Sequence, residues 1–301
     1  MRRGTCLLAK LFDGVKYIGY FTPLVYKESS MHVTNKVFVV TGGGNGMGRQ
    51  VVLELARRGA RIAAVDLNDG GLAETVQLAG VGDRVTAHSA NVTDRDAVAA
   101  LPDAIISLHG QIDGVVNIAG IIHSFAEFEE LPVEVTERVM NVNFWGTVNM
   151  CRTFLPVLRT RPAASLVNMS SLSALVPFAG QTFYGASKGG VKQFSEGLYA
   201  ELLGSSIKVS TIFPGNISTN LTTNSGVEMI DARGKKVRST TPEQAGREIV
   251  EGLVKGSFRI LVGSDARLLD RLVRLAPGCT TRMVAKQMKS VLEPYDARTT
   301  S

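Results

Sequence analysis

The sequence predicts an α/β protein with one doubly wound sheet of seven strands, mostly or fully parallel, and with helices on both faces. Three observations indicate this fold. Residues 36–68 form one strand–helix–strand unit with a glycine turn after its first strand. Short β-branched runs then alternate with stretches of helical periodicity as far as residue 263. Polar side chains follow the ends of several strands, where sheets of this kind bind their ligands.

Composition is that of a globular protein in a reducing compartment. The chain has 301 residues, of which 45% are hydrophobic and 20% charged, so it can bury a sizeable core. Cys6, Cys151 and Cys279 lie far apart without C-x-x-C spacing, which argues against a disulfide framework and against a zinc site. We therefore expect a cytoplasmic protein without a metal.

Positive charge lies at the two ends of the chain. Residues 1–36 carry a net charge of +4 and residues 255–301 a net charge of +5, which leaves −3 for the middle of a chain whose total is +6. No zinc finger and no aromatic RNA-binding motif accompanies these charges, so we expect no nucleic-acid partner. Basic ends with apolar residues between the charges fit either solvated termini or peripheral contact with an anionic membrane surface.

The sequence divides into three segments. Residues 1–34 form an N-terminal extension, amphipathic or partly disordered, in which Lys10, Asp13 and Lys16 interrupt every apolar run, so it cannot span a bilayer. It fits a helix on a membrane, a contact with another subunit, or a translation upstream of a true start at Met31. Residues 35–265 form the catalytic domain, and residues 266–301 form a basic amphipathic helical tail.

A nucleotide site is predicted at the first glycine turn, "TGGGNGMG", residues 41–48. The turn matches neither G-x-G-x-x-G nor the P-loop but T-G-x-x-x-G-x-G, and the following helix is expected to end near Gly59. Glycines let the backbone approach a pyrophosphate, and the helix directs its free N–H groups at it.

Asp66, at the end of the second strand, predicts NAD over NADP. A carboxylate there accepts hydrogen bonds from the adenosine ribose hydroxyls and repels a 2′-phosphate. Position 45 is Asn, so the turn carries no cation for that phosphate. The alternative for Asp66 is a cap on the next helix.

Further elements follow in order. The third strand ends just before Asn91, and the next helix, opened by Thr93 or Asp94, should be kinked or split near Pro102. The fourth strand ends at residues 117–120, where small side chains let a cofactor lie close, and His123 beyond it is expected in an exposed loop.

The second half carries a candidate catalytic set. A long helix over residues 135–158 holds Asn141 and Asn143, and the fifth strand ends at Ser170 and Ser171. Tyr184 and Lys188 share one face of a helix that runs to about Leu203. A sixth strand, a mobile substrate lid over residues 220–240, a helix with a capping box at residues 241–244 and a seventh strand complete the domain.

Residues 36–263 resemble the short-chain dehydrogenase/reductase family, of the type with the T-G-x-x-x-G-x-G turn. The resemblance rests on "TGGGNGMG", Asp66, "NIAG", "NVNFWG", a serine thirteen residues before "YGASK", and "PGNIST". It implies a Rossmann fold with strand order 3-2-1-4-5-6-7 and a homodimer or homotetramer. Asn91 departs from the Asp common in the family, and Ile118 departs from a second Asn.

The resemblance also implies roles. Tyr184 would be the general acid/base, Ser171 would bond the substrate oxygen, and Asn143, favoured over Asn141 by the register of "NVNFWG", would anchor a proton-relaying water. Lys188 would hold the nicotinamide ribose and, with the positive nicotinamide, lower the pKa of Tyr184. A shift of about three units from about 10 needs roughly 4 kcal/mol. The expected cofactor-binding residues are Thr41, Gly42, Asn45, Gly46, Met47, Gly48, Asp66, Leu67, Asn91, Val92, Asn117, Ala119, Gly120, Tyr184, Lys188, Pro214, Gly215, Ile217 and Thr219.

The predicted activity is hydride transfer between a nicotinamide cofactor, NAD rather than NADP, and a small-molecule secondary alcohol or ketone. Residues 175–178, "LVPF", lie between the serine and the tyrosine, and they fit either an apolar substrate pocket, ordinary packing or a subunit contact. A pocket would favour a hydrophobic substrate. The alternative function is a non-catalytic NAD-binding regulator, against which the complete Ser/Tyr/Lys set argues.

Overall fold

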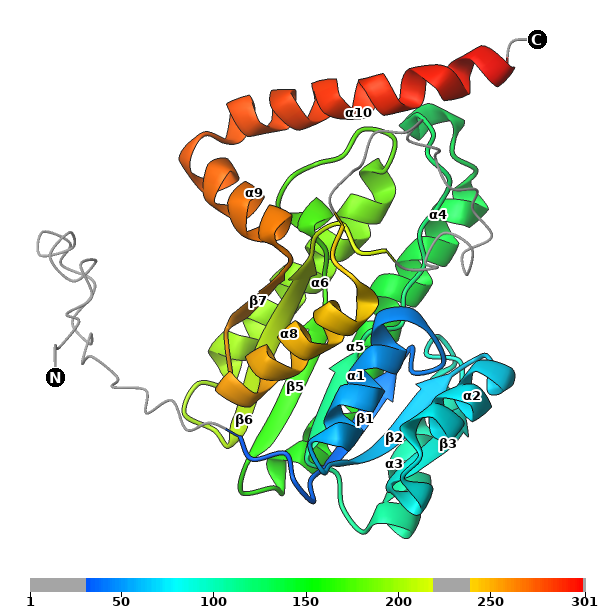
Figure 1. Ribbon diagram of the computed structural model, residues 1–301, viewed down its shortest axis with the longest axis vertical. Helices are drawn as coiled ribbons and strands as arrows, with labels where there is room; N and C mark the ends of the chain where they lie inside the picture. The colour runs from blue at the N-terminus through cyan, green and yellow to red at the C-terminus, as the bar shows by residue number, and fades with distance from the viewer. Residues whose placement is uncertain (1–30, 219–238, 300–301) are drawn as a thin grey trace, which may run out of the picture.

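A computed structural model describes residues 31–218 and 239–299 and, within them, side chains up to residue 288 (Figure 1). It contains one seven-stranded sheet in the order β3-β2-β1-β4-β5-β6-β7, and every pair of neighbouring strands is parallel. The strands are β1 (Val37–Thr41), β2 (Arg61–Asp66), β3 (Val85–Ser89), β4 (Gly114–Asn117), β5 (Ala164–Met169), β6 (Ile207–Pro214) and β7 (Arg259–Val262). The predicted fold class and strand order are confirmed.

Helices cover both faces of this sheet. They are α1 (Gly46–Arg57), α2 (Asp69–Ala79), α3 (Arg95–His109), α4 (Val133–Met140), α5 (Gly146–Arg159), α6 (Thr182–Glu201), α8 (Pro242–Lys255), α9 (Ser264–Leu275) and α10 (Pro277–Thr299). Figure 1 shows α1 and α8 side by side on the near face of the sheet. Buried side chains of α1, α2 and α8 form one core cluster with the strands, and those of α3, α5 and α6 form another on the opposite face.

Strand sequences explain why the sheet is buried on both faces. In β1, Phe38 and Val40 belong to the core under α1, whereas Val37 and Val39 belong to the core under α5. Successive side chains of a strand point to opposite faces, so a strand without polar residues must be covered twice.

Two helix predictions need correction in part. Pro102 does not split helix α3, which continues through it, because Asp94 caps its first turn and the buried Val98, Leu101 and Ile105 hold it against the sheet. In α8, Thr241 accepts the expected bond from the Gln244 N–H, but the Gln244 side chain donates to Glu248 instead of completing a capping box.

The long helix expected over residues 135–158 is divided. Helix α4 ends at Met140, a π-helical turn covers Asn141–Trp145, and α5 begins at Gly146. A π-turn inserts one extra residue into the helix and is frequent at functional sites. Here it brings Asn143 into the interior, where its side chain is fully buried.

The first described residues pack on the domain. The Met31 N–H donates to the Val254 carbonyl and Val33 lies in the core, so residues 31–34 of the expected extension already contact the domain. The expected boundary at residue 266 falls inside α9. Residues 1–30 lie outside the described residues, and among those described no helix is long and apolar enough to cross a membrane.

Candidate active site

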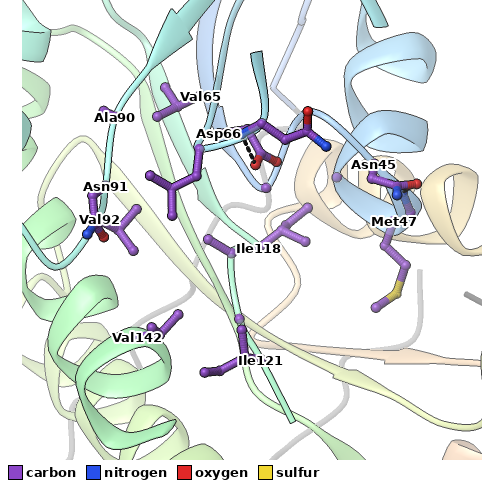
Figure 2. A pocket seen from close by; sticks show the side chains of 17 residues that line it. Asn45, Met47, Val65, Asp66, Ala90, Asn91, Val92, Ile118, Ile121 and Val142 are labelled. Atoms are coloured by element: carbon purple, nitrogen blue, oxygen red, sulfur yellow. Dashed lines mark hydrogen bonds between the residues drawn. The ribbon is translucent and has the colours of Figure 1, made fainter. Parts of the chain in front are cut away.

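A cleft of about 400 Å³ opens at the carboxyl ends of β1, β2 and β4 (Figure 2). It unites eleven of the expected cofactor residues, and these are Gly42, Asn45, Gly46, Met47, Gly48, Asp66, Leu67, Asn91, Val92, Ala119 and Gly120. Residues from four separate segments of the chain therefore meet here. This is where a doubly wound sheet binds a dinucleotide.

The glycine turn is shaped by close backbone contact. A Cβ on Gly48 would lie 2.0 Å from the Gly42 carbonyl oxygen, so no other residue fits that position. Asn45 caps α1 by accepting from the Gly46 N–H at 2.7 Å. The turn leaves the amino end of α1 facing the cleft, and helix amino ends of this kind bind phosphate groups.

Asp66 closes the end of the cleft beside β2. Its Oδ2 accepts from the Gly44 N–H at 2.9 Å, and its Oδ1 accepts from the Asn68 N–H at 3.1 Å, the bond that is dashed beside Asp66 in Figure 2. The carboxylate is thereby held over the glycine turn. Asn68, rather than Asp66, caps α2 by accepting from the Gly71 N–H.

Arg49 is a cation close to this turn, but its guanidinium faces other partners. It donates to the Gly44 carbonyl at 2.6 Å, to Glu74 at 2.6 Å and to Thr75 at 3.0 Å. These bonds tie α1 to α2 and occupy the guanidinium.

Thr41 and Asn117 have structural roles at the ends of β1 and β4. The Thr41 hydroxyl accepts from the Ile118 and Ala119 N–H groups and fixes the turn after β4. The Asn117 side chain is buried and donates to Asn168 at 2.8 Å. Neither residue lines the cleft.

Ser171 and Tyr184 meet beyond the end of β5. Ser171 follows the strand, and its hydroxyl accepts from the Ser173 N–H at 3.1 Å and forms a hydrogen bond with the Tyr184 side chain. Tyr184 lies in the first turn of α6. Ser170 bonds the Lys188 carbonyl at 2.8 Å and thereby anchors α6 to the strand end.

Lys188 is buried one turn further along α6. Only 3% of the residue is exposed, and its ammonium donates to the Met169 carbonyl at 3.1 Å. Burial lowers the pKa of Lys188 to about 8. Removing water from a cation without a carboxylate partner favours its neutral form.

The protein environment of Tyr184 raises its pKa, whereas the predicted lowering includes the positive charge of a bound nicotinamide. Burial raises the pKa, and the hydrogen bond with Ser171 opposes this shift only in part. Burial therefore outweighs the stabilisation of a phenolate by the neighbouring protein groups, so a further positive charge beside the ring would be needed to lower the pKa.

Asn143 is locked in place by three hydrogen bonds. Its Oδ1 accepts from the Ile121 N–H at 2.8 Å, while its Nδ2 donates to the Ile121 carbonyl at 2.9 Å and to Ser187 at 3.0 Å. Asn141 is exposed. Of the two asparagines, Asn143 is therefore the one that faces the interior, as the register of "NVNFWG" indicated.

Gly120 links this set to the cleft. A Cβ on Gly120 would lie 3.0 Å from both the Asn143 Oδ1 and the Lys188 Nζ. Because Gly120 also lines the cleft, the two side chains stand next to the cofactor-sized space. The absence of a side chain at position 120 leaves that approach open.

His123 corrects our expectation of an exposed loop histidine. Only 1% of the residue is exposed. Its Nε2 lies 3.2 Å from the Tyr184 backbone N, and its Nδ1 lies 2.6 Å from the Ser124 carbonyl oxygen. His123 lies in a loop sequence without a recognisable motif, so the sequence does not predict these contacts.

Other expected residues lie around the site. Pro214, Gly215 and Ile217 follow β6 at the same edge of the sheet but outside the cleft, and Thr219 and most of the expected lid lie outside the described residues. Val176 is buried in a cluster with α9 and α10, so part of "LVPF" is ordinary packing. Six further residues line the cleft that were not among the expected cofactor residues, and these are Val65, Asn68, Ala90, Ile118, Ile121 and Val142.

Known proteins share both sequence and fold with this chain. Residues 36–229 match the family model described as short chain dehydrogenase. The chain is 36% identical over 267 residues to SadH of Mycobacterium tuberculosis, a protein assigned as an oxidoreductase, and the match covers 83% of this chain and 94% of that protein. It is 33% identical over 242 residues to the 1-deoxy-11-beta-hydroxypentalenate dehydrogenase of Streptomyces exfoliatus, covering 79% and 86%.

A solved structure has the same fold. The crystal structure of a short chain dehydrogenase/reductase from Burkholderia phymatum in complex with NAD superposes with a TM-score of 0.72. It covers 81% of this chain and 96% of that one, at 24% sequence identity.

Proposed function

Since this chain belongs to the short-chain dehydrogenase/reductase family, we propose that it transfers hydride between NAD(H) and a hydrophobic secondary alcohol or ketone, with Tyr184 as general acid/base. Family membership makes the protein an oxidoreductase that acts on CH–OH groups with a nicotinamide cofactor. Two contacts at this edge of the sheet support the finer proposal. The Ser171 and Tyr184 side chains share a hydrogen bond, and the Asn143 and Lys188 side chains both approach Gly120, which lines the cleft.

The cleft fits the cofactor. Gly42, Gly46 and Gly48 of the turn line the cleft, the amino end of α1 faces it, and Gly120 keeps the approach to Lys188 open. Gly42, Gly46 and Gly48 would hold the pyrophosphate, Asp66 the adenosine ribose, and Lys188 the nicotinamide ribose. Bound NAD⁺ supplies a hydride acceptor and a positive charge.

The side chains then divide the proton chemistry of alcohol oxidation among them. Ser171 holds the substrate oxygen by a hydrogen bond. The Tyr184 phenolate takes the hydroxyl proton as the C–H bond breaks and the C=O bond forms, and in ketone reduction it returns that proton. Lys188 and the positive nicotinamide together lower the pKa of Tyr184 against the effect of burial. Asn143 holds the water through which the proton reaches solvent.

Selectivity for NAD is assigned to Asp66. Its carboxylate is held over the glycine turn by the Gly44 N–H, where a 2′-phosphate would meet a negative charge. Arg49 is already bonded to Glu74 and Thr75, so pairing with a phosphate would cost it those contacts.

A hydrophobic alcohol is the proposed substrate class. Leu175 and Phe178 lie between Ser171 and Tyr184 in the chain, pack against the cluster formed with α9 and α10, and keep part of their apolar surface exposed. The Streptomyces relative is named for a dehydrogenation of a hydroxylated compound, 1-deoxy-11β-hydroxypentalenate, which supports oxidation of an alcohol.

Replacement of one oxygen atom tests the proposal. With a substrate found by screening hydrophobic secondary alcohols with NAD⁺, Tyr184→Phe should lower kcat by about 10²- to 10⁴-fold, because it removes the general acid/base. NADH affinity should stay unchanged. Tyr199→Phe, which removes a hydroxyl from the far end of the same helix, is the matched control. Full turnover by Tyr184→Phe would refute the role, and NADH binding without turnover of any alcohol or ketone would favour the non-catalytic regulator.

Assembly and location remain predictions. A homodimer or homotetramer is proposed by family resemblance, and light scattering of the purified protein would measure it. Peripheral membrane contact of a cytoplasmic protein through its basic termini is the weaker proposal. It requires that deletion of residues 1–30 reduces binding to anionic liposomes, and equal binding with and without that segment would exclude it.

A further inference from the structure

The helix that carries Tyr184 begins without a cap of its own. Helix α6 starts at Thr182, and the preceding Gln181 forms no side-chain capping bond. The first four N–H groups of a helix have no partner within it, and the Tyr184 N–H is one of them. An uncapped first turn frays, and a side chain placed on it loses its position.

His123 supplies the missing acceptor from another part of the chain. It lies in the loop that leaves β4, 61 positions before Tyr184, and its Nε2 is 3.2 Å from the Tyr184 backbone N. The Gln181 side chain also donates to the His123 carbonyl, at 2.9 Å. The start of α6 is thus joined to the loop by two hydrogen bonds, and His123 is the acceptor in both.

The contacts of His123 define its protonation. The Ser124 carbonyl can only accept, so the Nδ1 that lies 2.6 Å away must carry a proton. The Tyr184 N–H can only donate, so Nε2 must be unprotonated. The imidazole is therefore neutral and in the Nδ1–H form, and burial favours this by lowering the pKa of His123.

We propose that neutral His123 is a positioning residue for catalysis, which fixes the first turn of α6, and with it the Tyr184 hydroxyl, by accepting the Tyr184 backbone N–H. This proposal rests on the proposed function, because it takes Tyr184, whose position the contact fixes, to be the general acid/base. The hydrogen bond from Tyr184 to His123 is donated by the backbone N–H and not by the phenol, so His123 acts through the backbone.

Two substitutions distinguish the effect of the His123 hydrogen-bond acceptor from the effect of the volume of its ring. His123→Leu fills space but has no acceptor, whereas His123→Gln can place Oε1 where Nε2 stands. With NAD⁺ and an alcohol substrate, His123→Leu should lower kcat by about ten- to a hundredfold, the cost of small misplacements in an active site. KM for NAD⁺ and the affinity for NADH should change little, and His123→Gln should recover most of kcat. Ser124→Ala removes an exposed neighbouring hydroxyl and keeps its carbonyl, so it is the matched control.

Two measurements need no turnover and separate this proposal from the proposed function. In wild-type protein, ¹⁵N NMR of labelled histidine should show His123 protonated at Nδ1 and not at Nε2. Hydrogen exchange of the Tyr184 amide should be faster in His123→Leu than in wild type and should slow again in His123→Gln. NADH binding by each variant shows that it is folded.

Three outcomes overturn the inference, whatever the activity of the wild type. One is a proton on Nε2. Another is equal exchange of the Tyr184 amide in wild type and His123→Leu. The third is a kcat for His123→Gln no higher than that of His123→Leu. A wild type without turnover but with the expected exchange pattern would refute the proposed function and leave the capping contact established.

Discussion

Lys188 is a cation that the fold buries at an energetic cost. Its ammonium is bonded to a backbone carbonyl, and burial lowers its pKa from 10.5 to about 8. Below pH 8 both the folded and the unfolded chain carry this proton, so the full cost of about 3 kcal/mol is present. Between pH 8 and 10.5 the unfolded chain binds more protons than the folded one, and the free energy of unfolding gains a contribution that rises with pH.

Lys188→Met should remove this pH dependence. Between pH 7.5 and 9.5, the free energy of unfolding of the wild type should rise relative to that of the variant by about 2 kcal/mol. Urea unfolding of both proteins at both pH values measures the free energies of unfolding. Subtracting the value of the variant from that of the wild type removes the contributions of other groups that titrate in this range. Lys192→Met, which removes a more exposed lysine from the same helix, is the control. A constant difference between wild type and Lys188→Met would show that the lysine keeps its ordinary pKa.

Gly120→Ala tests how tightly the catalytic groups are placed. The new Cβ would lie 3.0 Å from the Lys188 Nζ and the Asn143 Oδ1, so these neighbours must give by a few tenths of an ångström. Asn143 is held by three bonds, so we expect Lys188 to move and kcat to fall by about tenfold or more. Gly197→Ala places a Cβ in open space on α6 and should have no such effect. Wild-type kcat in Gly120→Ala would contradict the close approach.

At the scale of residues, the sequence predicts contacts between residues that are close in the chain and misses contacts between residues that are far apart in it. Tyr184 and Lys188 are predictable because helical spacing alone puts them on one face. His123 and Asn117 are not, since their partners Tyr184 and Asn168 lie 61 and 51 positions away. The direction of the Tyr184 pKa shift depends on burial, which no local pattern reveals.

At the scale of elements, the C-terminal helices support the segment that carries Ser171. Ala266 of α9 and Val284 of α10 are buried in one cluster with Leu172 and Val176. Leu172 directly follows Ser171, so the tail packs against the segment that carries this serine. The sequence indicated two amphipathic helices here and left open what they contact.

Val284→Asp should loosen this support. Val284 is 4% exposed, and an unpaired carboxylate cannot stay in an apolar cluster, so the tail should detach from Leu172. We expect kcat/KM for the alcohol to fall by about tenfold, equivalent to 1.4 kcal/mol, while NADH affinity is retained. Met283→Asp, at a neighbouring position that is 48% exposed, is the matched control. If the two variants have equal kcat/KM values, the tail does not support the site.

Capping residues predict where helices begin, whereas packing against the sheet determines whether a helix continues past an unfavourable residue. Asp94 and Thr241 cap their helices as the sequence indicates. Pro102 does not break α3, because contacts of the helix with the sheet hold it together across the missing N–H. The π-turn at Asn141–Trp145 is invisible in a helical pattern, yet it determines which asparagine faces the site.

At the scale of the whole molecule, the two edges of the sheet have different tasks. At the amino edge, the buried Asp113 carboxylate binds Lys36, Arg161 and the Val37 N–H and ties the starts of neighbouring strands together. At the carboxyl edge, the strands end in the residues of the cleft and the catalytic set. Alternation of strands and helices is enough to predict this division, because parallel strands bring all their carboxyl ends to one edge.

The most direct test of the central claim, a nicotinamide site selective for NAD, is titration of the purified protein with NADH and, separately, NADPH. Fluorescence of the reduced nicotinamide reports binding without any substrate. We predict tighter binding of NADH, and we predict that Asp66→Ala narrows the difference by relieving repulsion of the 2′-phosphate. Tighter binding of NADPH by the wild type would contradict the role of Asp66, and binding of neither would contradict the site itself.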